Sequence, residues 1–165
     1  MYAPPSPRPP VGVAAVEPWL DEHLPDYAVI THDPSFAARD EARFAHHPAE
    51  QMAKTVVVHD RARLVAAVLP ASDRLDLGKV RRLLGAGRAA RLATEGEIAD
   101  AFPAFEVGAV PPVAGFNLVL LDQRLLTYTR ILIPGGDHRH AVMVDPEELV
   151  RSTRARVVDL RAGDR

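Results

Sequence analysis

The hydrophobic and polar positions along the chain follow two different periods. Short runs of β-branched and apolar residues, typical of strands, alternate with segments in which apolar residues recur three and four positions apart, as on one face of a helix. Because the two patterns mix without a strict strand–helix–strand order, we expect an α/β or α+β fold with a mixed β-sheet. The predicted strands are residues 27–31, 53–59, 64–69, 118–121, 128–133, 140–144 and 156–160.

Capping residues mark several of the expected helix ends. Thr94 and Glu97 have the spacing of a capping box. Either Gly85 or Gly87 is placed to end the helix that Asp76 begins. The predicted helices are residues 16–24, 36–47 after Ser35, 77–85 (LGKVRRLLG), 95–102 and a segment that begins at Pro146 after the cap Asp145.

The first twelve residues differ in composition from the rest of the chain. Five of the first ten, MYAPPSPRPP, are Pro, which predicts a disordered or polyproline-like tail over residues 1–12. We expect residues 13–165 to form a single domain. A chain of this length with 47% hydrophobic residues can bury a substantial core.

Charge and composition exclude several classes of protein. The net charge is −2 and the pI about 6.4, so the chain lacks the strong basic field of DNA-binding and RNA-coating proteins, and only a local Arg patch would allow brief contact with RNA. The absence of Cys excludes disulfides, Cys-ligated zinc and a thiol nucleophile. No apolar run is long enough to span a membrane and no signal-peptide pattern is present. We therefore expect a cytoplasmic protein with neither DNA nor a membrane as partner.

Lysine is rare in this chain, and one of its two lysines lies at the start of a predicted strand. Of the 20 Lys and Arg residues, only Lys54, in MAKTVVVHD, and Lys79, in DLGKVRRLLG, are Lys. A Lys ammonium is a compact point charge whose pKa responds to burial, whereas Arg stays charged. Lys54 is therefore a candidate for chemistry that Arg cannot perform, and Lys79 is expected on a solvated helix face.

A second candidate is the loop GAVPP, Gly108 to Pro112. Glycine allows a positive φ and a close approach of the backbone, and the prolines stiffen the segment that follows. Such a loop can aim preorganised backbone N–H groups at a carbonyl oxygen. The alternative interpretation is an ordinary connecting loop.

A third candidate is the stretch GGDHRHAVMVD, in which the double glycine Gly135 and Gly136 precedes Asp137, His138 and His140. In a strand the two histidines would share one face, and two imidazoles can bind a metal. No third ligand with a recognised spacing accompanies them. Histidines that are solvated or hydrogen-bonded to protein are therefore the favoured interpretation, and we predict no metal and no other cofactor.

The common signatures of covalent catalysis and nucleotide binding are missing. No serine lies in a G-x-S-x-G context, and neither G-x-x-x-x-G-K-[ST] nor G-x-G-x-x-G occurs. What remains is an ammonium at the mouth of a strand, a Gly/Pro loop and a Gly-Gly turn followed by polar residues.

Taken in order, four stretches resemble the YbaK/EbsC family, also called the prolyl-tRNA synthetase-associated domain. The similarity runs from about Tyr27 to Leu160. The stretches are EQMAKTVVVHD, VAAVLPASDRLDLGKVRRLLG, FEVGAVPPVAG with the G-x-x-x-P loop of the family, and ILIPGGDHRHAVMVDPEELVRSTRARVVDL.

This resemblance implies a mixed, partly barrel-like sheet flanked by helices and a trans-editing aminoacyl-tRNA deacylase that hydrolyses the ester of a mischarged aminoacyl-tRNA. It implies that Lys54 anchors the substrate, and that the loop from Gly108 to Pro112 shapes the amino-acid pocket and offers donors to the carbonyl. No protein nucleophile is implied, because the 2′-hydroxyl of the terminal ribose can help to activate water. The substrate-binding residues expected with them are Gly135, Gly136, Asp137, His138 and His140. The partners implied are aminoacyl-tRNA and an aminoacyl-tRNA synthetase.

The chain departs from the family pattern at two positions. Pro134 replaces the polar or small residue that many members carry before the double glycine, and Ala141 aligns where some Cys-specific members have an acid. The amino acid that is edited therefore cannot be carried over. Two alternatives stay open: a non-catalytic module that binds aminoacyl-tRNA or a synthetase, and a metal-dependent hydrolase built on His138 and His140.

Overall fold

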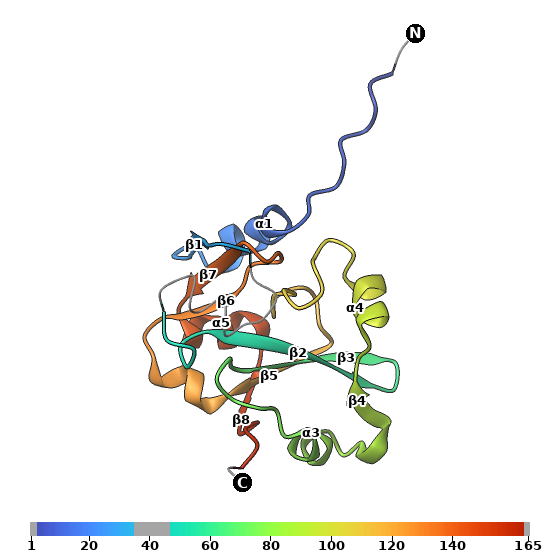
Figure 1. Ribbon diagram of the computed structural model, residues 1–165, viewed down its shortest axis with the longest axis vertical. Helices are drawn as coiled ribbons and strands as arrows, with labels where there is room; N and C mark the ends of the chain where they lie inside the picture. The colour runs from blue at the N-terminus through green and yellow to red at the C-terminus, as the bar shows by residue number, and fades with distance from the viewer. Residues whose placement is uncertain (1–2, 35–46, 164–165) are drawn as a thin grey trace.

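The computed structural model describes residues 3–34 and 47–163, and Figure 1 shows the arrangement of their helices and strands. The predicted helix 36–47 lies almost wholly outside these residues. The helices are α1 Val13–His23, α3 Leu77–Leu84, α4 Glu95–Ala101 and α5 Pro146–Thr153, with short 3₁₀ turns η1 Gly87–Ala89 and η2 Gln123–Thr127. The strands are β1 Ala28–Thr31, β2 Ala53–Asp60, β3 Arg63–Pro70, β4 Ala90–Leu92, β5 Leu118–Asp122, β6 Ile131–Pro134, β7 His140–Val144 and β8 Arg156–Val158.

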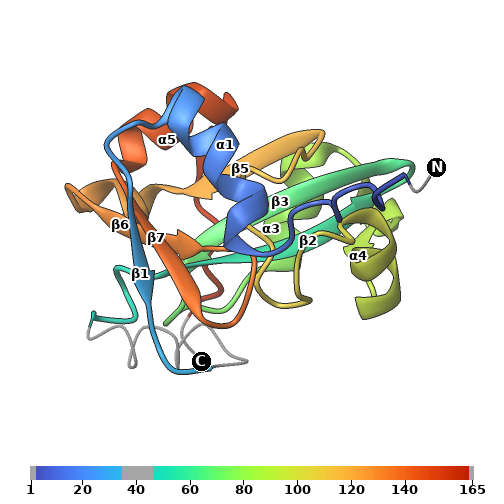
Figure 2. The ribbon, with the colours of Figure 1, turned by 90° about the horizontal axis from the view of Figure 1, so that it is seen from above.

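The described strands divide between two sheets. The larger has the order β4-β2-β3-β5-β8, with antiparallel pairs around β2 and parallel pairs on either side of β5. The smaller has the order β1-β7-β6 and is antiparallel. A parallel bridge between Met52 and Leu132 joins them, and Figure 2 shows the two groups of strands with α1 and α5 above them. The predicted α/β fold with a mixed, helix-flanked sheet is confirmed, and the described strands form no closed barrel.

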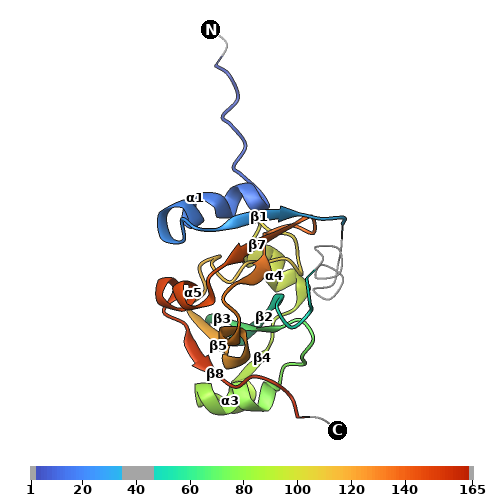
Figure 3. The ribbon, with the colours of Figure 1, turned by 90° about the vertical axis from the view of Figure 1, so that its left-hand side faces the viewer.

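Two cores lie on opposite faces of the larger sheet. Because side chains alternate along a strand, Ala53 of β2 packs in the core that joins both sheets with α1 and α5, whereas Val58 packs in the core beneath α3. The first core contains Val16, Leu20, Leu24, Ala66, Val68, Val119, Leu121, Leu125, Ile131, Ile133, Val142, Val144 and Leu149. Figure 3 shows α3 at the end of the molecule opposite to α1.

The capping residues act as the sequence predicts. The Asp76 carboxylate accepts a hydrogen bond from Lys79 N, and Gly85 ends α3 with a φ of 62°. Thr94 and Glu97 form the complete capping box of α4. Pro146 occupies the first turn of α5 behind its cap Asp145. Interactions within a few residues therefore suffice to fix these helix ends.

Two elements differ from the prediction. The strand expected over residues 128–133 begins only at Ile131, after the η2 turn, which starts where the Asp122 carboxylate accepts from Arg124 N and ends at Thr127. The three-residue strand β4 has no pattern of its own and forms by pairing with β2, with His59 opposite Arg91. The hydrophobic periodicity of the sequence does not show the contacts on which these two elements depend.

The expectation of a solvated Lys79 is wrong. Its ammonium lies 2.8 Å from the Asp159 carboxylate and donates to the carbonyl of Arg161 at 2.6 Å. Arg124 bridges Asp159 at 3.0 Å to the fully buried Asp122 at 2.9 Å. We call Lys79, Asp122, Arg124 and Asp159 the charged network; it ties α3 and η2 to the end of the chain after β8.

The Pro-rich segment runs away from the domain without regular secondary structure (Figure 1). Residues 3–10 are exposed, whereas Gly12 is buried and its N–H donates to the carbonyl of Ala104 at 2.7 Å. The boundary predicted at residue 12 stays a prediction. None of the described helices is long and apolar enough to cross a membrane.

Candidate functional site

Lys54 is the second residue of β2 and is partly buried opposite Leu69 of β3. Its ammonium donates to the backbone carbonyl of Asp73, in the connection between β3 and α3. By the alternation of the strand, Lys54 shares its face with Val56 and Val58, which pack toward α3. The cation is therefore held in one position by the backbone of a neighbouring turn.

The junction of the two sheets sets the position of Lys54 relative to the Gly-Gly turn. Leu132 N donates to the carbonyl of Gln51 at 3.1 Å beside the bridge between Met52 and Leu132. Lys54 and Pro134 each lie two residues beyond this parallel bridge. Because Pro134 has no N–H, the pairing of β2 with β6 cannot continue past this point. The strand that carries Lys54 and the strand that leads into the Gly-Gly turn separate here.

The G-x-x-x-P loop and the Gly-Gly turn are hydrogen-bonded to each other. Gly136 N donates to the carbonyl of Ala109 at 2.9 Å, and Glu106 N donates to the carbonyl of Gly136 at 2.9 Å. We call residues 106–112 and 134–140 together the loop–turn region. The structure thus brings together two candidates that residues 113–134 separate in the sequence.

His138 strengthens this connection. Its backbone N–H donates to Glu106 Oε2 at 3.0 Å, and its ring Nε2 lies 3.0 Å from the carbonyl of Val107. A carbonyl only accepts, so Nε2 carries the hydrogen. His138 is nearly buried, with 8% of its surface exposed. Glu106 was not singled out in the sequence, although it stands two residues before the loop glycine.

Two glycines of the loop–turn region have a positive φ. Gly108 has a φ of 89°, as the sequence predicts, and Gly136 has a φ of 95°. A Cβ on Gly136 would lie 2.9 Å from the backbone of Gly12 and 2.8 Å from the ring of Phe105, and a Cβ on Gly135 would lie 2.5 Å from the carbonyl of His140. The double glycine therefore permits close packing of three backbone segments.

Asp137 binds three donors of the protein. It accepts from Val13 N at 3.1 Å, from Arg139 N at 2.9 Å and from His140 Nδ1 at 2.7 Å. Burial would raise the pKa of this carboxyl, but these hydrogen bonds outweigh burial and hold the pKa below its usual value. Asp137 thereby fixes the start of α1 against the Gly-Gly turn.

The expectation that His138 and His140 share one face of a strand is wrong. Strand β7 begins at His140, so His138 lies in the turn before it, and the two rings bind different partners, Val107 and Asp137. Within the described parts of the chain, no three His, Asp or Glu side chains are grouped as metal ligands. Substrate binding by Asp137, His138 and His140 stays a prediction.

The loop packs on the face of β2 that is opposite to Lys54. Val110 contacts Val57 and Phe102 in a small core, and Pro112 is buried. Thr55 points to this same face, and its hydroxyl is buried without a hydrogen-bond partner among the residues that the structure describes. Nothing in the sequence distinguishes Thr55 from the other β-branched residues of this strand.

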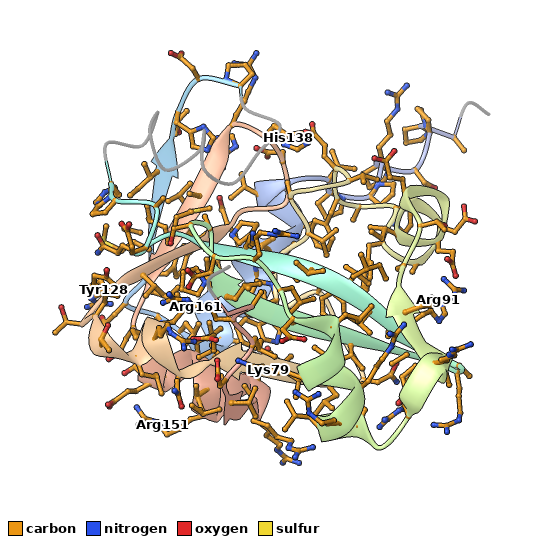
Figure 4. All side chains as sticks on the ribbon, turned by 60° about the horizontal axis from the view of Figure 1, so that its bottom comes forward. Lys79, Arg91, Tyr128, His138, Arg151 and Arg161 are labelled. Atoms are coloured by element: carbon orange, nitrogen blue, oxygen red, sulfur yellow. The ribbon has the colours of Figure 1, made fainter. Side chains whose placement is uncertain are left out.

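Two cavities adjoin the turn that holds Lys54. One of about 180 Å³ is lined by Glu50, Pro70, Ser72, Asp73, Arg124, Thr127, Tyr128 and Arg161. The other, of about 830 Å³, is lined by residues 72–77 and 161–163. They share Ser72, Asp73 and Arg161, and Figure 4 shows Arg161 and Tyr128 on this side of the molecule. A polar groove therefore begins where the Lys54 ammonium is anchored.

Comparisons with known proteins identify the family and the fold of the chain. One solved structure, "a putative trans-editing enzyme for prolyl tRNA synthetase", is 28% identical, with a TM-score of 0.82 over 99% of this chain and 100% of that one. A scaffold protein from a study of epitope backbone grafting by computational design is 29% identical, with a TM-score of 0.76 over 91% of this chain and 94% of that one. A search of curated protein sequences found no match. The family model of the aminoacyl-tRNA editing domain matches residues 32–152, and the chain belongs to this family, the YbaK family.

Proposed function

We propose that this protein is a trans-editing deacylase that hydrolyses the ester bond of a mischarged aminoacyl-tRNA. Membership of the aminoacyl-tRNA editing family and the likeness to a putative trans-editing enzyme for prolyl-tRNA synthetase support this proposal. The observation that carries it is the loop–turn region, in which a positive-φ glycine loop is bound to the Gly-Gly turn beside the strand of Lys54. A cytoplasmic location, where aminoacyl-tRNA is used, belongs to the same proposal.

The proposed reaction needs no nucleophile from the protein. Water attacks the ester carbonyl carbon, a tetrahedral oxyanion forms, and the bond to the ribose oxygen breaks as that oxygen takes up a proton. The products are the free amino acid and the uncharged tRNA. The 2′-hydroxyl of the terminal ribose helps to activate the water, and backbone N–H groups of the loop around Gly108 stabilise the oxyanion. The sequence offers no activated Ser or Cys for a covalent route.

Lys54 supplies the positive charge in this scheme. Its contact with the Asp73 carbonyl fixes the ammonium before substrate binds, so little rotamer freedom is lost on binding. From there it can bind the phosphate of the terminal nucleotide, while the loop on the opposite face of β2 supplies the donors to the oxyanion. The pocket for the amino acid is assigned to the loop, through Gly108 and Pro112, and to the Gly-Gly turn, through Gly135 and Gly136.

The decisive experiment is ester hydrolysis with a panel of mischarged aminoacyl-tRNAs, with and without a chelator. Turnover that survives chelation supports the proposal and identifies the amino acid. Binding without turnover would instead establish the non-catalytic module, which keeps the fold and partners. Turnover that disappears with the chelator would establish the metal-dependent alternative.

A further inference from the structure

Positive charge is concentrated in about one fifth of the chain, residues 61–93. Residues 61–93 carry eight Lys and Arg side chains but only two acidic ones, Asp73 and Asp76, a net charge of +6 in a chain whose total is −2. Such an asymmetry between segments indicates a local basic surface that the overall charge conceals. The segment covers β3, α3, η1 and β4.

The fold gathers five of these side chains around α3. Asp60 pairs with both Arg63 of β3 and Ala90 of β4, which places the end of the β2–β3 hairpin beside η1 and β4. Arg81 Nε donates to the carbonyl of Ala90 at 2.9 Å and closes α3 onto the same place. Figure 4 shows nitrogen-tipped side chains around α3 and the adjoining turn. We define the α3 basic surface as Arg61, Arg63, Arg81, Arg82 and Arg88.

Acidic neighbours neutralise only part of this surface. The buried Asp60 lies 2.6 Å from Arg63 and 3.1 Å from Arg61, and thereby balances one of the two charges. Arg82 and Arg88 are exposed and form no ion pair with a described residue. Arg82 and Arg88 therefore present full charges to solvent.

The α3 basic surface lies on the same face of β2 as Lys54. Lys54 and Asp60 are six residues apart on one strand, an even number, so their side chains point to the same side. At about 3.3 Å per residue, the two positions are separated by about 20 Å. A ligand that contacts both the ammonium of Lys54 and the guanidinium groups around α3 must therefore be an extended polyanion that spans about this distance.

We propose that the α3 basic surface binds backbone phosphates of the acceptor-stem duplex of the tRNA whose aminoacylated 3′ end reaches Lys54. This inference rests on the proposed function. Duplex RNA is bound mostly through its phosphates and shape, and Arg is well suited to phosphate oxygens. The surface acts on affinity and orientation of the tRNA, and the ester is hydrolysed about 20 Å away, as estimated from the strand rise.

The first test measures the binding of uncharged tRNA as a function of salt. The double variant Arg82→Gln/Arg88→Gln should reduce the slope of log K against log salt by about 2, since each lost phosphate contact removes about 0.9. The matched control, Arg8→Gln/Arg151→Gln, removes the same charge from the N-terminal segment and from α5. It should keep the wild-type slope. Thermal melting checks that both double variants fold.

The second test compares hydrolysis of aminoacyl-tRNA with hydrolysis of the same ester on a short 3′ oligonucleotide without a duplex. Arg82→Gln/Arg88→Gln should lower kcat/KM for the tRNA and leave kcat/KM for the oligonucleotide at the wild-type value. A salt slope that the double variant leaves unchanged overturns the inference. This holds also if the variant loses affinity for a synthetase, because the surface would then bind that protein and not tRNA. Equal losses on both substrates overturn it as well. If the wild-type protein hydrolyses neither ester, the proposed function is refuted. The salt slopes still test whether the α3 basic surface binds tRNA phosphates.

Discussion

The loop–turn region and the charged network both hold distant segments together, but they use different chemistry. In the loop–turn region, backbone groups of Gly136, Ala109 and Glu106 bind one another, and positive-φ glycines make the close approach possible. In the charged network, Lys79 and Arg124 bind the carboxylate of Asp159. The first arrangement depends on backbone shape, and the second depends on pH and salt. Substitutions should therefore affect the two regions in different ways.

The largest effect is expected at Lys54, on the face of β2 opposite to the loop. Lys54→Ala should lower ester hydrolysis by about 10²–10³-fold, as for the loss of one preorganised charged group that positions the substrate. The free energy of unfolding should fall by no more than about 1 kcal/mol, the net value of one hydrogen bond. Lys54→Arg should also be impaired, because a planar fork replaces a compact ammonium in a shaped site.

Lys79→Ala is the matched control in the charged network. It should retain turnover and lose some stability, because Asp159 and the Arg161 carbonyl lose a donor. Single-turnover rates and urea unfolding of the three variants separate the two roles. Wild-type turnover in Lys54→Ala would remove Lys54 from the site.

Gly136→Ala should cost about 3 kcal/mol of folding free energy, since strain at a φ of 95° adds to a clash with the backbone of Gly12. Gly85→Ala is the control: its φ of 62° is also positive, but a Cβ there meets nothing within 4 Å. It should cost only about 1 kcal/mol. Urea unfolding measures both, and equal losses would show that close packing adds nothing.

Thr55→Val should raise the free energy of unfolding by about 1 kcal/mol, because it replaces a buried hydroxyl that has no partner in the described region by a methyl of the same shape. The control is Thr153→Val, whose hydroxyl donates to the carbonyl of Leu149 at 2.7 Å. That variant should lose stability by a similar amount. A fall in turnover of Thr55→Val at unchanged stability would instead assign the hydroxyl to substrate.

The smallest effect is expected from the charged network on acidification. Lys79, followed by Arg124, lowers the pKa of Asp159 to about 2, from a usual value of 3.8. A lowered pKa contributes stability that is present above pH 3.8 and is lost as the pH falls toward 2. Because the Asp159 side chain is 42% exposed, solvent limits this contribution to less than about 1 kcal/mol.

Asp159→Asn should therefore unfold slightly more easily at pH 7 and show a flatter stability profile between pH 4 and 2. Chemical unfolding at several pH values measures the difference in stability between Asp159→Asn and the wild type. Salt at about 0.5 M should reduce this difference, because it screens the ion pairs of Asp159. A difference in the free energy of unfolding between the two proteins that grows below about pH 2 would contradict the role given to the ionised Asp159.

Local interactions made much of the fold predictable. The caps Asp76, Thr94 and Asp145 act within three residues of their helices, and the period of β2 and β3 shows directly in the sequence. The positive φ of Gly108 could be predicted because only the absence of a Cβ makes that conformation inexpensive.

The remaining features depend on partners far away in the chain. Lys79 could not be placed, because Asp159 is 80 residues away. His138 was assigned to a strand face, since nothing nearby reveals its bond to the Val107 carbonyl. The sequence likewise does not reveal that the buried hydroxyl of Thr55 has no hydrogen-bond partner among the described residues.

The pairing of β1 with β7 has a consequence for the synthesis of the protein. Ala28 lies opposite Met143, so the two partners are 115 residues apart. At a rate of about 5–20 residues per second, the ribosome needs about 6–23 s to make the second strand after the first. Strand β1 is therefore synthesised well before its partner, and the Gly-Gly turn is made just before β7. The loop–turn region cannot form on a nascent chain that ends before this turn.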